Sequence, residues 1–189
     1  MKEQTIEDLY VDQLRDLYDA ERQIIKALPK MIRAASSEEL KAALNEHLEV
    51  TKEQEQRIVQ IFEARGEKAK AQKCKGMTGV LEEGSELVEK GWEQAVRDAA
   101  IISAAQRVEH YEMAGYGTAR DLATLLGEEE AAQLLEKTLE EEKEADQKLT
   151  ELSEQINEDA QSEGDEDLSA KEPTSESRKE TSPRKKSVA

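Results

Sequence analysis

Residues 99–121 read AAIISAAQRVEHYEMAGYGTARD, and the fold prediction depends on this stretch. Successive residues of an α-helix are rotated by about 100°, so Glu109 and Glu112 fall in the middle of a largely apolar stripe. Such a stripe normally faces the core of a protein. Because an unpaired ionised carboxylate is very costly to bury, these two acids predict protonation, pairing or a bound cation. The stripe consists of Ile102, Ala105, Gln106, Glu109, Glu112, Met113 and Tyr116.

The composition is typical of a helical protein. The 189 residues are rich in Ala, Glu, Lys, Leu and Arg, and they include only three Pro and one Phe. Long amphipathic helices have this composition. The length predicts one folded domain with room for a substantial core. We therefore expect the all-α class.

The charge and the cysteine content limit the partners and the compartment. The formal net charge is −17. An acidic body of this kind repels nucleic acid and anionic membranes and attracts cations, although solvated helix faces give the same balance. A lone cysteine, Cys74, excludes an intrachain disulfide and suits a reducing cytoplasm. The N-terminus lacks the apolar core of a signal peptide, and no run approaches the roughly 20 apolar residues that span a bilayer. We expect a cytoplasmic protein that binds neither membranes nor nucleic acid.

Capping residues and glycines divide the chain into four long helices. Ser36 with Glu39 marks the start of a second helix after a short turn. Gly66 is expected to end that helix, and Gly127 is expected to end the third. The expected long helices cover residues 6–35, 36–65, 93–126 and 128–157.

A segment of different character, residues 67–95, separates the two helical pairs. Its first part is polar and basic, and residues 79–91, GVLEEGSELVEKG, could form a short amphipathic helix between glycines. A connection of this length can cross the end of a bundle or run along its side. Two short turns around one long connection predict a four-helix bundle with a short helix in the crossover between its second and third helices.

The last part of the chain, residues 160–189, has almost no apolar residues. Such a segment cannot bury enough surface to offset the entropy of ordering, so we expect a disordered polar tail after a bundle domain of residues 1–159. Residues 182–186, SPRKK, look like the short basic repeats of DNA-associated tails, which bind phosphates through charge. One copy on an acidic body favours a solubilising tail over a DNA-binding one.

Several further acids fall at the same depth as the central pair. Glu21 stands in the otherwise apolar inward seam of the first helix, and counting from the turns places Glu112 opposite Glu142 and Glu109 opposite Asp146. Like charges this close cannot all stay ionised without protons or cations between them. Helical bundles with metal pairs project Glu and Glu-x-x-His groups inward. The candidate metal ligands are Glu21, Glu109, Glu112, Glu142 and Asp146.

Three other side chains lie near this set. His47 and Glu55 share the inward face of the second helix, but His47 lies about 6 Å along the axis from the expected layer. His110 lies at the flank of the central stripe. Both histidines could instead be hydrogen-bonded residues of the bundle. The alternative to a metal site is a structural polar layer held by salt bridges to Lys or Arg.

Four segments of the chain carry a family resemblance: DLYDAERQI (16–24), HLE (47–49), AAQRVEHYEMAGYGT (104–118) and LEKTLEEEKEADQKL (135–149). They resemble the YciF-like family of the ferritin-like, rubrerythrin-related superfamily, and the resemblance covers about residues 5–158. It implies a ferritin-like four-helix bundle and a bacterial stress-response protein with an iron or manganese di-metal centre, one or two ions per chain, and peroxide or oxygen chemistry. We also expect a homodimer.

The chain departs from the superfamily pattern at two positions. That pattern has Glu on the first helix, Glu-x-x-His on the second, Glu or Glu-x-x-Glu on the third and Glu-x-x-His on the fourth. Ala145 stands where the fourth helix would carry His, and Val50 stands where close relatives have a second Glu after HLE. An alternative function is therefore a non-enzymatic helical scaffold or dimer with a degenerate metal site. The positions that match the pattern are Glu21, Glu109, Glu112 and Glu142.

Overall fold

The computed structural model describes residues 4–170 as five α-helices with no strand among them. The all-α class and the short helix in the long connection are confirmed. Across this part of the chain, no helix carries an apolar run long enough to cross a bilayer. The helices are α1 (Ile6–Ala34), α2 (Glu38–Ala64), α3 (Lys75–Val88), α4 (Gln94–Leu125) and α5 (Glu129–Ala170).

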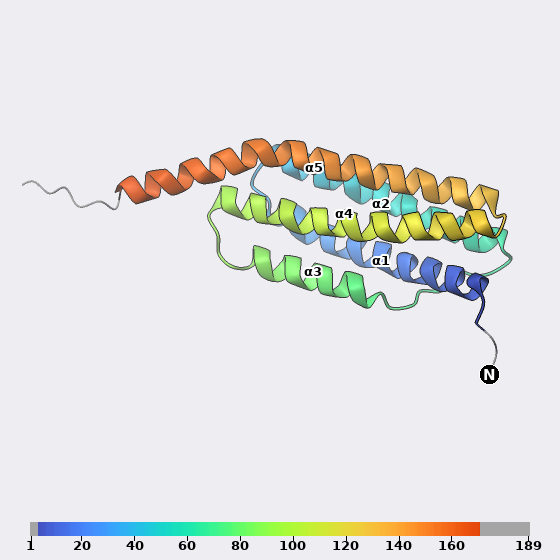
Figure 1. The fold of residues 1–189 in the computed structure, drawn as a ribbon. Coiled ribbons are helices and arrows are strands. Elements are labelled where there is room, and N and C mark those ends of the chain that lie inside the picture. The colour runs from blue at the N-terminus through green and yellow to red at the C-terminus, as the bar shows by residue number, and fades with distance from the viewer. Residues whose placement is uncertain (1–3, 171–189) are drawn as a thin grey trace, which may run out of the picture.

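The four long helices form two antiparallel hairpins, α1 with α2 and α4 with α5 (Figure 1). The long connection between the hairpins returns the chain to the other end of the bundle, so that α2 and α4 run in the same direction (Figure 1). Helix α3, within this connection, lies along the side of the bundle against α4 and α1. The connection therefore runs along the bundle rather than across its end.

The expected ends of the long helices agree with the structure to within a few residues, except for α5. Ser37, rather than Ser36, caps α2, and its hydroxyl accepts a hydrogen bond from the Leu40 backbone N–H at 3.2 Å. Gly66 and Gly127 follow α2 and α4 with φ angles of 73° and 74°. Side chains disfavour this left-handed conformation, so glycine is the residue that ends each helix there.

Helix α3 begins earlier than the glycine-bounded segment 79–91. It spans Lys75–Val88, and Cys74 is its N-cap, with the sulfur accepting from the Met77 backbone N–H at 3.3 Å. The polar stretch before it therefore contributes the first turn of a helix. Cysteine is not among the preferred N-capping residues, so the sequence carries no signal for a helix beginning at Lys75, and the predicted start was too late.

Helix α5 continues to Ala170 instead of ending near residue 157, so residues 160–170 are helical and do not belong to a structureless tail. The first proline of this region is Pro173. An established helix extends at little cost through polar residues until a breaker is reached. Residues 171–189 lie outside the described residues, and the prediction for that part of the tail stays a prediction.

The core consists of two apolar clusters with a polar layer between them. One cluster includes Ile24, Leu44 and Ile101, and the other includes Leu17, Ile58 and Tyr116. Along each long helix, the residues of this polar layer fall between residues of the two clusters. This polar layer consists of Glu21 on α1, Thr51 and Gln54 on α2, Glu109 and Glu112 on α4, and Glu142 on α5.

The turn between α1 and α2 is tied to the start of α4. The carboxylate of Asp98, which is 3% exposed, accepts hydrogen bonds from the backbone N–H groups of Ser36 and Ser37, both at 2.7 Å. Arg97 adds bonds to the Ala34 carbonyl and the Ser36 hydroxyl at 2.9 and 3.0 Å. These contacts fix how far one hairpin is shifted along the other.

Replacing this carboxylate tests its structural role. Asp98→Ala leaves two backbone donors without their acceptor and should lower the free energy of unfolding by about 2–4 kcal/mol. Asp98→Asn retains one acceptor oxygen and should cause a smaller loss. Urea unfolding of both variants measures the effect, and a wild-type midpoint for Asp98→Ala would contradict it.

Truncation after residue 159 tests the role of the C-terminal segment. Figure 1 shows the last turns of α5 extending past the other helices, and Ile156 is the last buried side chain among those described. Removal of 160–189 should therefore leave the melting temperature nearly unchanged, because little apolar surface is lost. Thermal unfolding of the two chains measures this, and a fall of many degrees would show that the segment docks.

Candidate metal centre

The four candidate glutamates on α1, α4 and α5 all lie inside the bundle. Glu21, Glu112 and Glu142 are fully buried and Glu109 is 2% exposed. Each occupies a core position of its helix, so the same periodicity that buries the neighbouring apolar residues also buries the carboxylate. The expectation that these four acids point into the bundle is therefore confirmed.

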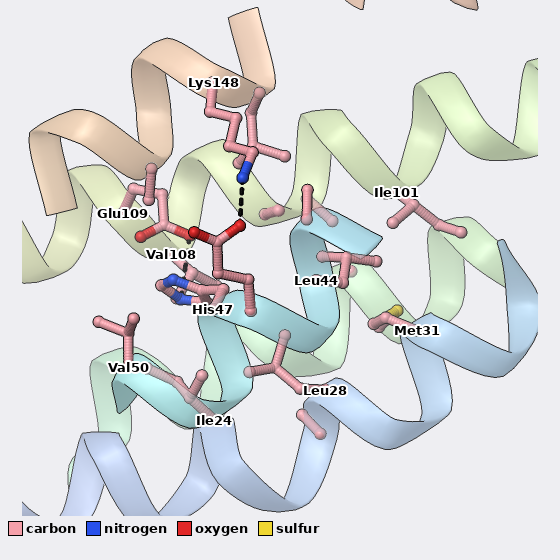
Figure 2. Close-up of a pocket in the computed structure, with 18 of the residues that line it drawn as sticks. Ile24, Leu28, Met31, Leu44, His47, Val50, Ile101, Val108, Glu109 and Lys148 are labelled. Carbon is pink, nitrogen blue, oxygen red and sulfur yellow. Dashed lines mark hydrogen bonds and ion pairs between the residues drawn. The ribbon is translucent and has the colours of Figure 1, made fainter. Parts of the chain in front are cut away.

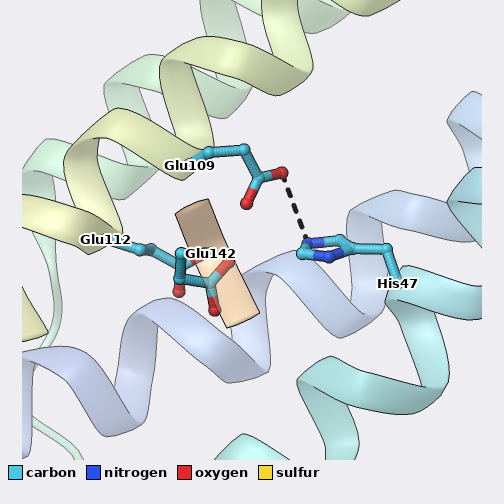
Figure 3. A group of neighbouring side chains, drawn as sticks. All are labelled: His47, Glu109, Glu112 and Glu142. Atoms are coloured by element: carbon cyan, nitrogen blue, oxygen red, sulfur yellow. Dashed lines mark ion pairs between the residues drawn. The ribbon is translucent and has the colours of Figure 1, made fainter. Parts of the chain in front are cut away.

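Three of these glutamates converge with a histidine of α2. One ligand atom from each of His47, Glu109, Glu112 and Glu142 can be chosen so that all four lie within 4.8 Å of one another (Figure 3). The side chains come from α2, α4 and α5, so the group exists only in the folded bundle. We call these four residues the carboxylate–histidine cluster.

The cluster contains more hydrogen-bond acceptor atoms than the surrounding side chains have donors to satisfy. The hydrogen bonds of the described residues leave several of its buried atoms without a partner: His47 Nε2, Glu109 Oε2, both oxygens of Glu112, and Glu142 Oε2. Buried polar atoms in native proteins are nearly always satisfied by protein, water or an ion. Within the described residues, no Lys or Arg makes a direct ion pair with Glu109, Glu112 or Glu142.

Glu21 lies beside the cluster and has a partner of its own. Tyr116 of α4, also fully buried, donates its hydroxyl hydrogen to one carboxylate oxygen of Glu21, and the other oxygen has no partner. The charges of Glu21 and Glu142 act on each other. Glu21 thus extends the acidic interior toward α1, and Tyr116 orients it.

Burial and mutual repulsion favour protonated carboxyl groups. Burial, followed by the charge of Glu142, raises the pKa of Glu21 and of Glu109 well above 4.5. Burial, followed by the charge of Glu21, does the same to the pKa of Glu112. The pKa of Glu142 rises to about 7, mainly through burial. Without a cation, the layer therefore holds protons near neutral pH.

His47 is held in its neutral form. Burial lowers its pKa to about 4, and its Nε2 lies 3.4 Å from an oxygen of Glu109. Because burial also favours the protonated form of Glu109, this contact is not an ion pair between two full charges at neutral pH. A neutral imidazole is the form that binds metal ions.

Helix α2 adds polar residues that the sequence did not mark as part of the site. Gln54 donates to Glu142, and Arg57, which is 6% exposed, donates to Glu141 at 2.8 Å and to Thr138 at 3.1 Å. The positive charge of Arg57 also lowers the pKa of Glu142. The position of Arg57, three residues after the inward Gln54, is the sequence signal that could have identified it.

The structure places the remaining candidates at the edge of the layer. Asp146 contacts His110 at 3.3 Å and accepts from Gln106 at 3.1 Å. The His110 side chain is 66% exposed and stays outside the cluster. A carboxylate oxygen of Glu55 lies 3.7 Å from Nε of Arg22. Each of these side chains therefore pairs with a neighbour on the outer part of the bundle.

An all-helical bundle with buried glutamates on facing helices defines the ferritin-like class of proteins. The chain belongs to the family described as domain of unknown function DUF892, whose model matches residues 5–161. It is 49% identical over 154 residues to protein YciF of Escherichia coli K12, a match that covers 81% of this chain and 93% of that protein.

Solved structures have the same fold. The E. coli stress protein YciF superposes with a TM-score of 0.79 at 48% identity, covering 84% of this chain and 99% of that one. YcfI of Rhodopseudomonas palustris, described as a putative structural protein, has a TM-score of 0.76 at 44% identity over 78% and 94% of the two chains. A protein from Xanthomonas campestris, at 21% identity and a TM-score of 0.68, shares the fold.

The raised pKa of Glu142 predicts how stability depends on pH in the presence of a chelator. Folded Glu142 keeps its proton up to about pH 7, whereas the unfolded chain releases it near 4.5. The free energy of unfolding should therefore fall as the pH rises between these values, by on the order of 3 kcal/mol from this group. Urea unfolding across this range measures the profile.

Two variants isolate this contribution. Glu142→Gln cannot release a proton and should reduce the slope of the profile, while the raised pKa values of Glu21, Glu109 and Glu112 preserve part of that slope. Glu154→Gln, at an exposed position of the same helix, should keep the wild-type slope. The low pKa of His47 acts with the opposite sign between about 4 and 6.5, but it is common to all three proteins. Parallel profiles for wild type and Glu142→Gln would contradict the prediction.

Proposed function

We propose that this protein binds a redox-active divalent metal ion, iron or manganese, at the carboxylate–histidine cluster. The observation that carries the proposal is the convergence of His47, Glu109, Glu112 and Glu142 within 4.8 Å in the interior. Several of their polar atoms have no hydrogen-bond partner. A cation would satisfy these atoms together and would replace the protons that the carboxylates otherwise keep.

The donor set favours particular metals. Three carboxylates and one imidazole are mostly hard oxygen ligands with one nitrogen, which suits iron and manganese, while the absence of thiolates disfavours soft metal sites. The proposal includes a second ion, which Glu21, Glu112 and Glu142 would hold. Gln54 and Tyr116 then orient carboxylates from outside, as partners of ligands commonly do.

The stress-response role follows from the homology to E. coli YciF, which is described as a stress protein. An iron or manganese ion at this site would supply electron transfer to peroxide or oxygen. The chain contributes a water-poor interior, four acids that balance the charge of the metal, and a neutral imidazole. We also propose that the protein is a cytoplasmic homodimer.

A non-enzymatic scaffold is the second candidate. Ala145 occupies the position of the superfamily histidine, and the amide of Gln54, rather than a cation, contacts Glu142. One solved relative at 44% identity is described as a putative structural protein. In this case, the carboxylates would stay protonated and the layer would serve only to fix the register of the helices.

Removal of one cluster carboxylate separates these functions. Glu109→Gln keeps the shape of the side chain but loses the charge that a metal needs, so bound metal should fall by about ten-fold or more. With chelator at pH 8, the variant should be more stable than wild type, because it no longer buries an acid with a raised pKa. Elemental analysis measures the bound metal, and urea unfolding measures the free energy of unfolding.

Glu49→Gln is the matched control, since Glu49 lies on the exposed side of α2 and the substitution removes the same charge. It should leave metal content and stability unchanged. If Glu109 and His47 form a true buried ion pair, Glu109→Gln will instead cost about 3–5 kcal/mol. If Glu109→Gln is destabilised in this way and the wild-type protein takes up no iron or manganese, the metal-binding function is ruled out.

A further inference from the structure

An apolar cavity lies beside the carboxylate–histidine cluster. Its volume is about 210 Å³, and all five helices contribute to its walls. His47 and Glu109 line its inner end, and Met31 and Ile101 lie toward the other end (Figure 2). The remaining lining residues are mainly aliphatic. They include Ile24, Leu28, Leu44, Val80, Val108 and Leu149.

The deeper walls of this space belong to the interior, while its rim reaches solvent at Glu144 and Lys148. Leu44 is 3% exposed, Ile101 is 1% exposed and Leu149 is 5% exposed. An engineered apolar cavity of about 150 Å³ in another protein stays dry and binds benzene. A larger cavity with similar walls can therefore hold an apolar guest, and its walls would gain the contacts that an empty space denies them.

The inner end of the cavity offers one hydrogen-bonding position. His47 Nε2 and Glu109 Oε2 both lack a partner, and Glu109 is almost fully buried. A single uncharged polar group, such as a hydroxyl, can bond there. An ionised carboxylate on the ligand would lose its hydration there without gaining a cation, because the neighbouring groups of the cluster are glutamates.

The cavity also has an entrance that opens at little cost. Glu46 of α2 and Lys148 of α5 line its rim and form an ion pair across it (Figure 2). Their side chains are 66% and 48% exposed. Exposed ion pairs contribute little to stability, so two side-chain rotations can admit a ligand without unfolding a helix.

We propose that this cavity binds an uncharged aliphatic molecule of about six to ten carbon atoms, with a hydroxyl-type end group facing His47 and Glu109. The aliphatic walls hold the chain, and the two unpartnered atoms fix the polar end. The inference goes beyond the metal-binding function and does not require it. The aliphatic walls are present with or without an ion, whereas the polar end needs His47 and Glu109 free of metal, so the chelator-treated protein contains the complete ligand site.

A titration of the full-length protein with 1-hexanol tests the proposal. The methyl NMR resonances of Ile24 and Ile101, both on the cavity wall, should shift and saturate in the chelator-treated protein, in which His47 and Glu109 hold no ion. Hexanoate should bind the chelated protein about ten-fold or more weakly than 1-hexanol, because its charge cannot be placed beside the glutamates. Absence of saturable shifts, or equal binding of hexanoate, overturns the proposal.

Adjacent alanines on α2 supply matched variants. Ala43 lines the cavity and is 8% exposed, whereas Ala42 is exposed. Ala43→Leu fills the cavity and should weaken 1-hexanol binding by about ten-fold or more, while Ala42→Leu should bind like wild type. Ala27→Leu fills it from α1 and provides the test if Ala43→Leu does not fold.

Circular dichroism establishes that each variant is folded. Wild-type affinity in a folded cavity-filled variant overturns the proposal. Metal content measured on the same samples keeps the two hypotheses separate. Saturable 1-hexanol binding by a protein that takes up no metal supports the cavity site alone, and metal uptake without 1-hexanol binding supports the metal centre alone.

Discussion

The burial of four glutamates in one layer is the constraint on which the rest of this structure depends. Carboxylates in an apolar interior cannot all ionise unless something balances their charge. Around Glu21 and Glu142 the part of the chain that the structure describes supplies neutral hydrogen-bond donors, from Tyr116 and Gln54. The cation of Arg57 is directed to Glu141 at the margin. The balance therefore comes from protons or from a bound ion, and the two alternatives respond oppositely to pH.

The chain topology brings these groups together. Two hairpins joined by a long connection place α2 and α5 next to each other only in the assembled bundle, and His47 meets Glu142 across that boundary. Asp98 fixes the relative shift of the hairpins through the turn that precedes α2. Because the ligands come from separate helices, any ion binds the folded state in preference to the unfolded chain and stabilises it.

The polar layer also divides the hydrophobic core. Apolar clusters on either side supply the burial that holds the helices together, so the layer can tolerate unpaired polar atoms that would be unfavourable elsewhere. On one side, the packing stays open as a cavity that touches His47 and Glu109. Polar groups at one end of an apolar space are the usual composition of a small-molecule site.

The sequence by itself determined the helical class, the two hairpins and the inward direction of Glu21, Glu109, Glu112 and Glu142, because side-chain direction within a helix follows from local periodicity. Only the tertiary structure decided which inward groups meet. In the structure His47 belongs to the cluster and Asp146 lies at its edge. Counting residues along the helices had predicted Asp146 at the level of Glu109 and His47 too far along the helix axis. The tilt and shift of one helix against another arise from packing over the whole interface, which no single segment encodes. The cavity depends on that packing for the same reason.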